Sequence, residues 1–132
     1  MQPDHSGMLK IIDKYREKNL DTPIVVEGKN DVQSLRKIEF SGEIIIFNSG
    51  LSIVRFSEEL KERYNRIIIL TDFDAKGRRL RDDIEKFFVS SGGKADTYLW
   101  EYLKRNAAVS TIEELPFAVS RSRTYISLPG KS

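Results

Sequence analysis

Residues 66–77 read RIIILTDFDAKG, and this stretch decides the fold. The apolar run 67–70 is typical of a strand that is buried on both faces of a parallel sheet. The chain then becomes polar at once, and Asp72 and Asp74 follow two residues apart. Side chains two residues apart face the same way in an extended segment. We therefore expect both carboxylates to point in one direction from the end of a central strand.

A second strand end, upstream, has the same character. Residues 23–31 read PIVVEGKND, so the predicted strand 24–26 is followed by Glu27 and Asp31. The carboxyl ends of parallel strands open into the crevice where α/β sheets bind ligands. Carboxylates that meet there repel one another unless a cation lies between them, and oxygen-only ligand sets suit Mg²⁺ or Mn²⁺. The two strand ends predict a divalent-metal site that acts on phosphate.

Helical patterns alternate with these strands. The further elements expected are an amphipathic helix at about 8–18, a helix capped by Asn30 with Gln33, a buried strand at 44–47, a helix at 53–64, a helix at 80–88 and a fourth strand at 95–99. Such alternation predicts right-handed crossovers and a sheet covered on both faces. We expect a three-layer α/β fold with a central, mostly parallel four-stranded sheet. Residues 1–132 are expected to form one domain, with its core at about 20–100.

The pattern weakens beyond Trp100. Residues 101–106 predict a short helix, and Ser110 with Glu113 predicts a capping box, followed by a stop at Pro116. Residues 118–132 are polar and basic with little periodicity. We expect them to form a loose tail.

The composition narrows the class of protein. The chain has 132 residues, with 22 Lys and Arg against 20 Asp and Glu, and this net charge of +2 does not by itself indicate nucleic-acid binding. The absence of cysteine excludes disulfides and thiolate metal sites and fits a cytoplasmic protein. No apolar run approaches the roughly 20 residues of a membrane span. His5 lies in a polar leader and is expected to be exposed.

Basic residues gather beside the acidic clusters. Lys29 lies between the two carboxylates of the first cluster, and Lys76, Arg78, Arg79 and Arg81 follow the second. A basic rim around a metal site suits a phosphodiester substrate, because lysine neutralises phosphate charge and arginine clamps its oxygens. The alternative is that these side chains solvate helix faces.

Other residues of these turns have two interpretations each. Glu27 would ligate metal or act as general acid-base, or it would cap the next helix or pair with Lys29. The turn Asn48-Ser49-Gly50 ends the middle strand, so Asn48 would donate into the crevice or form an ordinary turn. We expect Gly28 to permit a tight turn, and Gly77 to leave free N–H groups in a first helical turn that suit phosphate.

Together these motifs resemble the Toprim domain of bacterial primases, type IA and type II topoisomerases and 5S ribosomal RNA maturation nucleases. The resemblance rests on VVEGKND at 25–31, NSG at 48–50 and LTDFDAKG at 70–77, and it covers roughly residues 20–100. It implies that Glu27 is the general acid-base and that Asp72 and Asp74 bind Mg²⁺, with Asp31 as an additional candidate. The segment 112–115 resembles a glutamate-bearing segment of the maturation nucleases.

The resemblance implies a small Toprim nuclease acting on RNA or DNA. The chain lacks the cysteines of a primase zinc module and has no room for the separate topoisomerase domain that carries a nucleophilic tyrosine, so those cores are less favoured. The main alternative is a non-catalytic adaptor that binds nucleic acid beside a partner protein. A remote alternative is an aspartyl phosphotransferase with Asp72 as nucleophile, although Ala75-Lys76-Gly77 departs from that motif.

Overall fold

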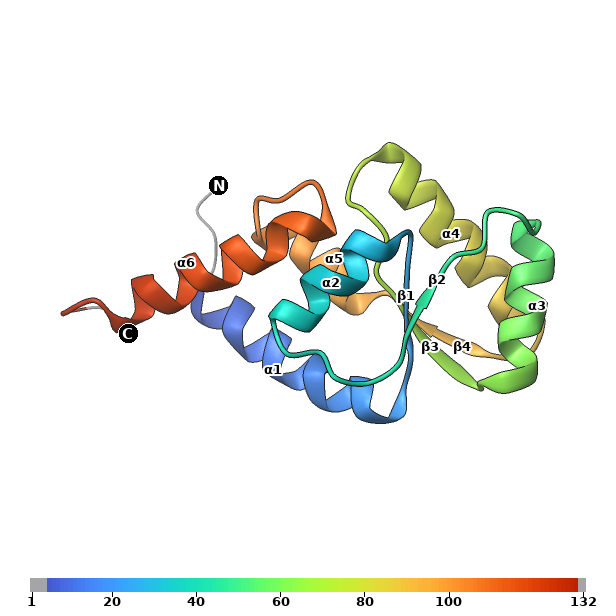
Figure 1. Ribbon diagram of the computed structural model, residues 1–132, viewed down its shortest axis with the longest axis horizontal. Helices are drawn as coiled ribbons and strands as arrows, with labels where there is room; N and C mark the ends of the chain where they lie inside the picture. The colour runs from blue at the N-terminus through green and yellow to red at the C-terminus, as the bar shows by residue number, and fades with distance from the viewer. Residues whose placement is uncertain (1–4, 131–132) are drawn as a thin grey trace.

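The computed structural model describes residues 5–130. A four-stranded sheet in the order β2-β1-β3-β4 lies at its centre, all three neighbouring pairs are parallel, and helices cover both faces (Figure 1). The elements are α1 (His5–Asp21), β1 (Ile24–Val26), α2 (Lys29–Lys37), β2 (Ile44–Ile46), α3 (Ile53–Arg63), β3 (Arg66–Ile69), α4 (Ala75–Ser90), β4 (Lys94–Asp96), α5 (Tyr98–Asn106), η1 (Ile112–Glu114) and α6 (Leu115–Ser127). The predicted three-layer α/β fold is confirmed, and the sheet is entirely parallel.

Each face of the sheet has its own hydrophobic core. On one face Val26 and Ile68 pack with α1, α2, α5 and α6, and on the other Val25, Ile67 and Ile69 pack with α3 and α4 (Figure 1). Successive strand residues point to opposite faces, so a strand between two helical layers must be apolar throughout. This explains the unbroken apolar runs of β1 and β3.

The strand order creates the crevice. The chain leaves β1 for β2 through α2, and then crosses back past β1 to β3 through α3. The carboxyl ends of β1 and β3 are therefore neighbours at the point where the winding direction reverses, which is where open α/β sheets bind ligands.

The second strand differs from its prediction. We expected a buried strand at 44–47, but β2 is an edge strand whose residues are only partly covered, and Ile46 is 40% exposed. An apolar strand is fully buried only where other strands pair with it on both sides. In the described sheet, β2 pairs with β1 alone.

The C-terminal third differs most. The predicted strand 95–99 is wrong beyond residue 96, because α5 begins at Tyr98 and buries Leu99, Trp100 and Leu103 at helical spacing. The predicted loose tail is wrong for residues 118–127, which belong to α6 and bury Ala118 and Val119. Residues 131–132 lie outside the described part of the chain.

Two smaller predictions in this region are also wrong. Glu114, rather than Glu113, makes the capping bonds, because its carboxylate accepts hydrogen bonds from the backbone N–H groups of Ser110 and Thr111, both at 3.1 Å. Pro116 lies in the first turn of α6 instead of ending a helix, and proline fits there because that position needs no N–H donor.

The first helix is confirmed and is longer than predicted, with Met8, Ile11, Ile12 and Tyr15 buried. His5 is not in a polar leader but begins α1, where Nδ1 lies 2.8 Å from Ser122 Oγ and the ring stacks on Tyr125 at 4.3 Å. Among residues 5–130, no helix is both long and apolar enough to cross a membrane.

Asn19 joins the end of α1 to the segment before β2. Its buried amide nitrogen donates to the carbonyls of Thr22 and Glu43 at 3.1 and 3.0 Å, and its oxygen accepts from the N–H of Gly42 at 2.8 Å. One side chain therefore satisfies three backbone groups.

We predict that Asn19→Ala lowers the free energy of unfolding by about 2–4 kcal/mol. The substitution removes the side-chain donor to the Thr22 carbonyl and the acceptor of the Gly42 N–H, whereas the Glu43 carbonyl keeps its bond from the Ile24 N–H. Urea unfolding measures the change. Asn30→Ala is the matched control, since Asn30 is exposed and should change stability by less than about 0.5 kcal/mol. Equal stability of the two variants would contradict the role given to Asn19.

Candidate metal and phosphate site

The ends of β1 and β3 are joined by one side-chain bond. Glu27 follows β1, and its Oε2 accepts a hydrogen bond from the backbone N–H of Asp72, which follows β3, at 2.8 Å. The structure thus brings together the two acidic strand ends of the sequence. Glu27 neither caps α2 nor pairs with Lys29 among the described contacts; it bridges to the neighbouring strand.

Asp72 is also held from the far side of the crevice. Its Oδ1 accepts from the N–H of Ile112 at 3.0 Å, and its carbonyl accepts from the indole N–H of Trp100 at 3.3 Å. The Phe73 carbonyl accepts from Lys104 Nζ at 2.8 Å. The start of η1 and the helix α5 therefore fix the acidic loop.

Asp74 points into the start of α4. Its Oδ1 accepts from the N–H of Gly77 at 2.7 Å, and Thr71 Oγ1 donates to the Gly77 carbonyl at 2.7 Å. The expected free N–H at Gly77 is therefore wrong, because Asp74 occupies it. Asp74 uses one oxygen in this cap and is otherwise exposed.

Asp31 replaces the predicted cap of α2. Gly28, rather than Asn30, precedes the helix, and its N–H donates to Asp31 Oδ2 at 3.0 Å. Asp31 is only 6% exposed, and it is close enough to Glu27 and Asp72 for their charges to act on it. The additional candidate therefore belongs to the same cluster.

The carboxylates of this cluster are difficult to ionise together. Burial raises the pKa of Glu27 and that of Asp72, and the charge of Asp74 raises both further. Burial, followed by the charge of Asp72, raises the pKa of Asp31 from 3.8 to about 6. Desolvation and like charge act in the same direction on all three groups, so a cation placed among them would be strongly favoured.

The donor set fits a hard divalent cation, although within residues 5–130 no three acidic or histidine side chains lie close enough to form a ready-made metal site. Glu27, Asp72 and Asp74 each use one carboxylate oxygen in a backbone bond. The second oxygens of Asp72 and Asp74 remain to bind a cation, and the second oxygen of Glu27 remains for a cation or for a proton. Mg²⁺ commonly takes only one or two carboxylates and completes its shell with water and substrate oxygens.

The basic residues of α4 differ in their surroundings. Lys76 and Arg79 line a cavity that also contains Glu27. Arg81 is 7% exposed, pairs with Asp82 and Glu101, and lies with its guanidinium carbon 4.3 Å from the Trp100 ring centroid. Arg81 therefore ties α4 to α5 and does not belong to a basic rim.

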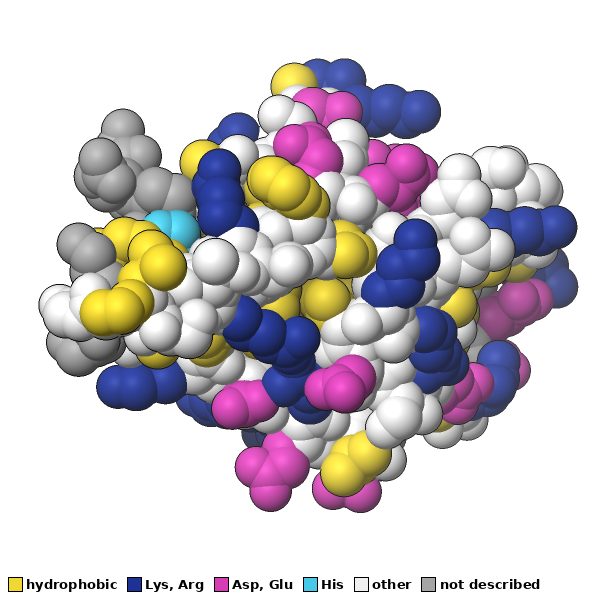
Figure 2. Space-filling view, turned by 60° about the vertical axis from the view of Figure 1, so that its left-hand side comes forward, with side chains coloured by type: hydrophobic (Ala, Val, Ile, Leu, Met, Phe, Trp, Pro, Cys, Tyr) yellow, Lys and Arg dark blue, Asp and Glu magenta, His cyan; other side chains and the backbone are white. Residues whose placement is uncertain are grey.

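The remaining candidate phosphate ligands are less constrained. Lys29 is exposed at the start of α2, and exposed Arg78 lies 5.0 Å above the Trp100 ring. Asn48 accepts from the N–H of Gly50 at 2.9 Å, as in an ordinary turn. Figure 2 shows Lys and Arg interspersed with Asp and Glu on one face of the molecule, without a single basic patch.

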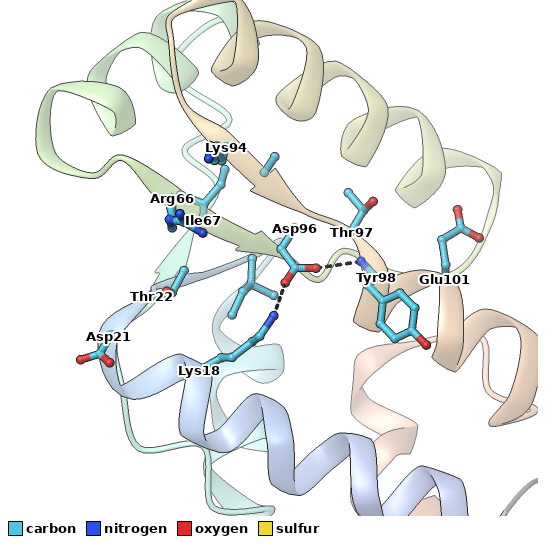
Figure 3. Close-up of a pocket in the computed structure, with 12 residues that line it drawn as sticks. Lys18, Asp21, Thr22, Arg66, Ile67, Lys94, Asp96, Thr97, Tyr98 and Glu101 are labelled. Atoms are coloured by element: carbon cyan, nitrogen blue, oxygen red, sulfur yellow. Dashed lines mark hydrogen bonds and ion pairs between the residues drawn. The ribbon is translucent and has the colours of Figure 1, made fainter.

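A larger hollow lies elsewhere in the described part of the chain. It has a volume of about 680 Å³ and lies between the end of α1 and the strands β3 and β4 (Figure 3). Its central carboxylate, Asp96, already accepts hydrogen bonds from Lys18, Tyr15 and the N–H of Tyr98. Because Asp96 is already paired within the fold, and because this hollow is separate from the cluster of Glu27, Asp31, Asp72 and Asp74, it is not the candidate metal site.

Sequence analysis missed the residues that support the acidic loop. Trp100 and Lys104 bind its carbonyls, and the charges of Glu113 and Glu114 raise the pKa of Asp72 further after burial and Asp74. The spacing of Leu99, Trp100 and Leu103 was the available signal for α5. The resemblance had pointed to 112–115, and that segment does lie beside Asp72.

This all-parallel sheet, with acidic residues after its two central strands, has the arrangement expected of the Toprim class of metal-binding, nucleic-acid-related domains. The sequence profile of the Toprim domain matches residues 22–113, so the chain belongs to this family.

Its relatives are small proteins of similar length. The UPF0292 protein TV1259 of Thermoplasma volcanium is 47% identical over 82% of this chain and 91% of its own length. The UPF0292 protein MJ1624 of Methanocaldococcus jannaschii is 33% identical over 82% of this chain and 86% of its own length. A solved structure of a protein from Aquifex aeolicus matches with a TM-score of 0.69 and 27% identity, over 80% of this chain and 94% of that one.

We predict that Gly77→Ala lowers the free energy of unfolding by about 1–3 kcal/mol. A Cβ at this position would lie 1.9 Å from the Asp72 carbonyl oxygen, so α4 and the acidic loop would have to separate. Gly28→Ala is the control: a Cβ there meets nothing within 4 Å, and its φ of −155° suits any residue. Thermal unfolding compares the two, and a larger loss at Gly28 would contradict this geometry.

We predict that Asp31→Asn stabilises the metal-free protein at neutral pH. Its folded pKa of about 6 exceeds the ordinary 3.8, so the folded protein binds the proton more tightly, and stability falls as pH rises from about 4 through 6. The asparagine oxygen still accepts from Gly28. In EDTA at pH 7.5 the variant should be about 1–3 kcal/mol more stable, with the difference vanishing near pH 4.

Urea unfolding over this pH range measures the effect, with Glu17→Gln on the exposed face of α1 as control. The same pH dependence in Asp31→Asn and wild type would contradict the prediction.

Proposed function

We propose that the protein is a Mg²⁺-dependent nuclease that hydrolyses phosphodiester bonds of RNA or DNA. The observation that carries the proposal is the 2.8 Å bond between the Glu27 carboxylate and the N–H of Asp72. This bond holds a candidate acid-base group against candidate metal ligands at the reversal point of a Toprim sheet. Mn²⁺ is the alternative ion, since it prefers the same oxygen ligands.

Glu27 is the proposed general acid-base. One of its oxygens accepts from Asp72, which leaves the other for a proton of water or of the leaving oxygen. Burial raises its pKa, and the charges of Asp72 and Asp74 raise it further, against the lowering effects of the hydrogen bond from the Asp72 N–H and of the Lys76 charge. A carboxyl group with a raised pKa exchanges protons more readily near neutral pH.

Asp72 and Asp74 are the proposed metal ligands, with Asp31 in support. Their orientation is fixed before any ion binds, because backbone N–H groups hold one oxygen of each. A bound Mg²⁺ would supply charge stabilisation at the phosphoryl oxygens. Lys76 and Arg79, beside Glu27, would neutralise and orient the phosphate.

A non-catalytic nucleic-acid adaptor, acting with a partner protein, is the second candidate. It is favoured by the separation of the carboxylates, no three of which form a ready-made metal site within residues 5–130. An adaptor would bind nucleic acid in a metal-dependent way without turnover.

We predict that Glu27→Gln lowers metal-dependent cleavage of mixed RNA and DNA substrates by about 10²–10⁴-fold. The amide oxygen can still accept from Asp72, so folding and metal affinity should persist. Asp72→Asn should lose both cleavage and metal binding, measured by calorimetric titration with Mg²⁺. Glu62→Gln, on the exposed face of α3, is the control.

Full activity and metal affinity in Asp72→Asn would overturn the assignment. Metal-dependent binding of nucleic acid with no cleavage by the wild type would favour the adaptor.

A further inference from the structure

A cavity of about 440 Å³ opens directly beside Glu27. It lies on the face of the sheet covered by α3 and α4, and its apolar wall consists of Phe47, Ile53 and Leu80. These side chains pack on the core but are only partly buried. Apolar walls with a few polar groups are typical of ligand sites.

The aromatic part of this wall is held in place from behind. The Phe47 ring meets the buried Phe56 ring edge to face, at a centroid distance of 4.9 Å and an angle of 84°. Phe47 follows the edge strand β2 and is not covered by a further strand. A fixed, partly open aromatic ring offers a surface on which a flat ring can pack.

One face of α4 supplies the polar groups. Lys76, Arg79 and Asp83 are spaced by three and four residues, so they lie along one side of the helix together with Leu80. The two cations are at the end near Glu27. Along the helix axis, Asp83 lies about 10 Å beyond Lys76 and about 6 Å beyond Arg79. The charges therefore run from cationic beside the carboxylate site to acidic at the far end.

We propose that this cavity binds an unpaired nucleobase of the substrate, next to the phosphodiester bond that is cleaved. The inference rests on the proposed function and names its substrate class. The phosphate would lie against Lys76 and Arg79, the base would pack on Phe47, Ile53 and Leu80, and Asp83 would accept a hydrogen bond from a base N–H group.

A paired base does not fit this arrangement. In a duplex both faces of a base are stacked and its edge is bonded to its partner, so the base must leave the stack to enter a pocket. The proposed substrate is therefore single-stranded, or carries an unpaired nucleotide at the cleavage position.

The test compares one oligonucleotide alone and annealed to its complement. Cleavage by the wild type with Mg²⁺ should be about tenfold or more faster on the single strand, as expected for stacking of one base. Binding to Glu27→Gln, measured by fluorescence anisotropy, should show the same preference. Leu80→Gln and Asp83→Ala should raise KM several-fold for the single strand with less change in kcat. Val89→Gln, at an exposed apolar position of the same helix, should leave KM unchanged.

The outcomes separate the two proposals. Equal cleavage and binding of duplex and single strand, or unchanged KM in both cavity variants, would overturn the cavity assignment and leave the nuclease standing. Tight single-strand binding that is lost in Leu80→Gln, with no cleavage by the wild type, would support the cavity and remove the nuclease.

Discussion

The hydrogen bond from the Asp72 N–H to Glu27 is the contact on which the site depends. It closes the gap between the ends of the two central strands and forces carboxylates into a partly buried crevice. Burying these charged groups together is unfavourable, and this raises the pKa values of Glu27, Asp31 and Asp72. Backbone N–H groups offset part of this cost, and the bonds from Trp100 and Ile112 keep the loop from relaxing away.

The topology explains why these two ends meet. Strand order β2-β1-β3-β4 makes β1 and β3 neighbours although α2, β2 and α3 separate them in the chain. The crossovers α2 and α3 lie on opposite faces, so neither of them covers the carboxyl ends of β1 and β3. The same reversal divides the core into two layers, and the cavity beside Glu27 opens in the layer of α3 and α4.

The sequence predicts the central part of this fold well, because Ile24–Val26 and Ile67–Ile69 are buried on both faces and are apolar for that reason alone. It predicts the caps less well: Gly28 has no side chain to signal its role, and Asp31 acts from within the helix. The predicted helix 101–106 lies within α5. The first turn of α5 and the helix α6 were missed because Leu99 and Val119 face a core built mainly by distant segments. The ion pair between Arg81 and Glu101 likewise depends on the packing of α4 against α5. The spacing of residues along the sequence therefore does not predict it.

Arg81 is held between the carboxylates of Asp82 and Glu101 and the Trp100 ring. This lowers the number of cations that the protein can offer to the phosphates of a nucleic acid. A cation already neutralised inside the fold releases no counterions when nucleic acid binds. Near the crevice, the first turns of α4 thus offer three cations outside any described ion pair, Lys76, Arg78 and Arg79, for which the logarithmic salt slope on a single strand is no steeper than about −2. Attraction of this size falls only modestly with added salt, so selectivity would come from the shape of the crevice more than from its charge.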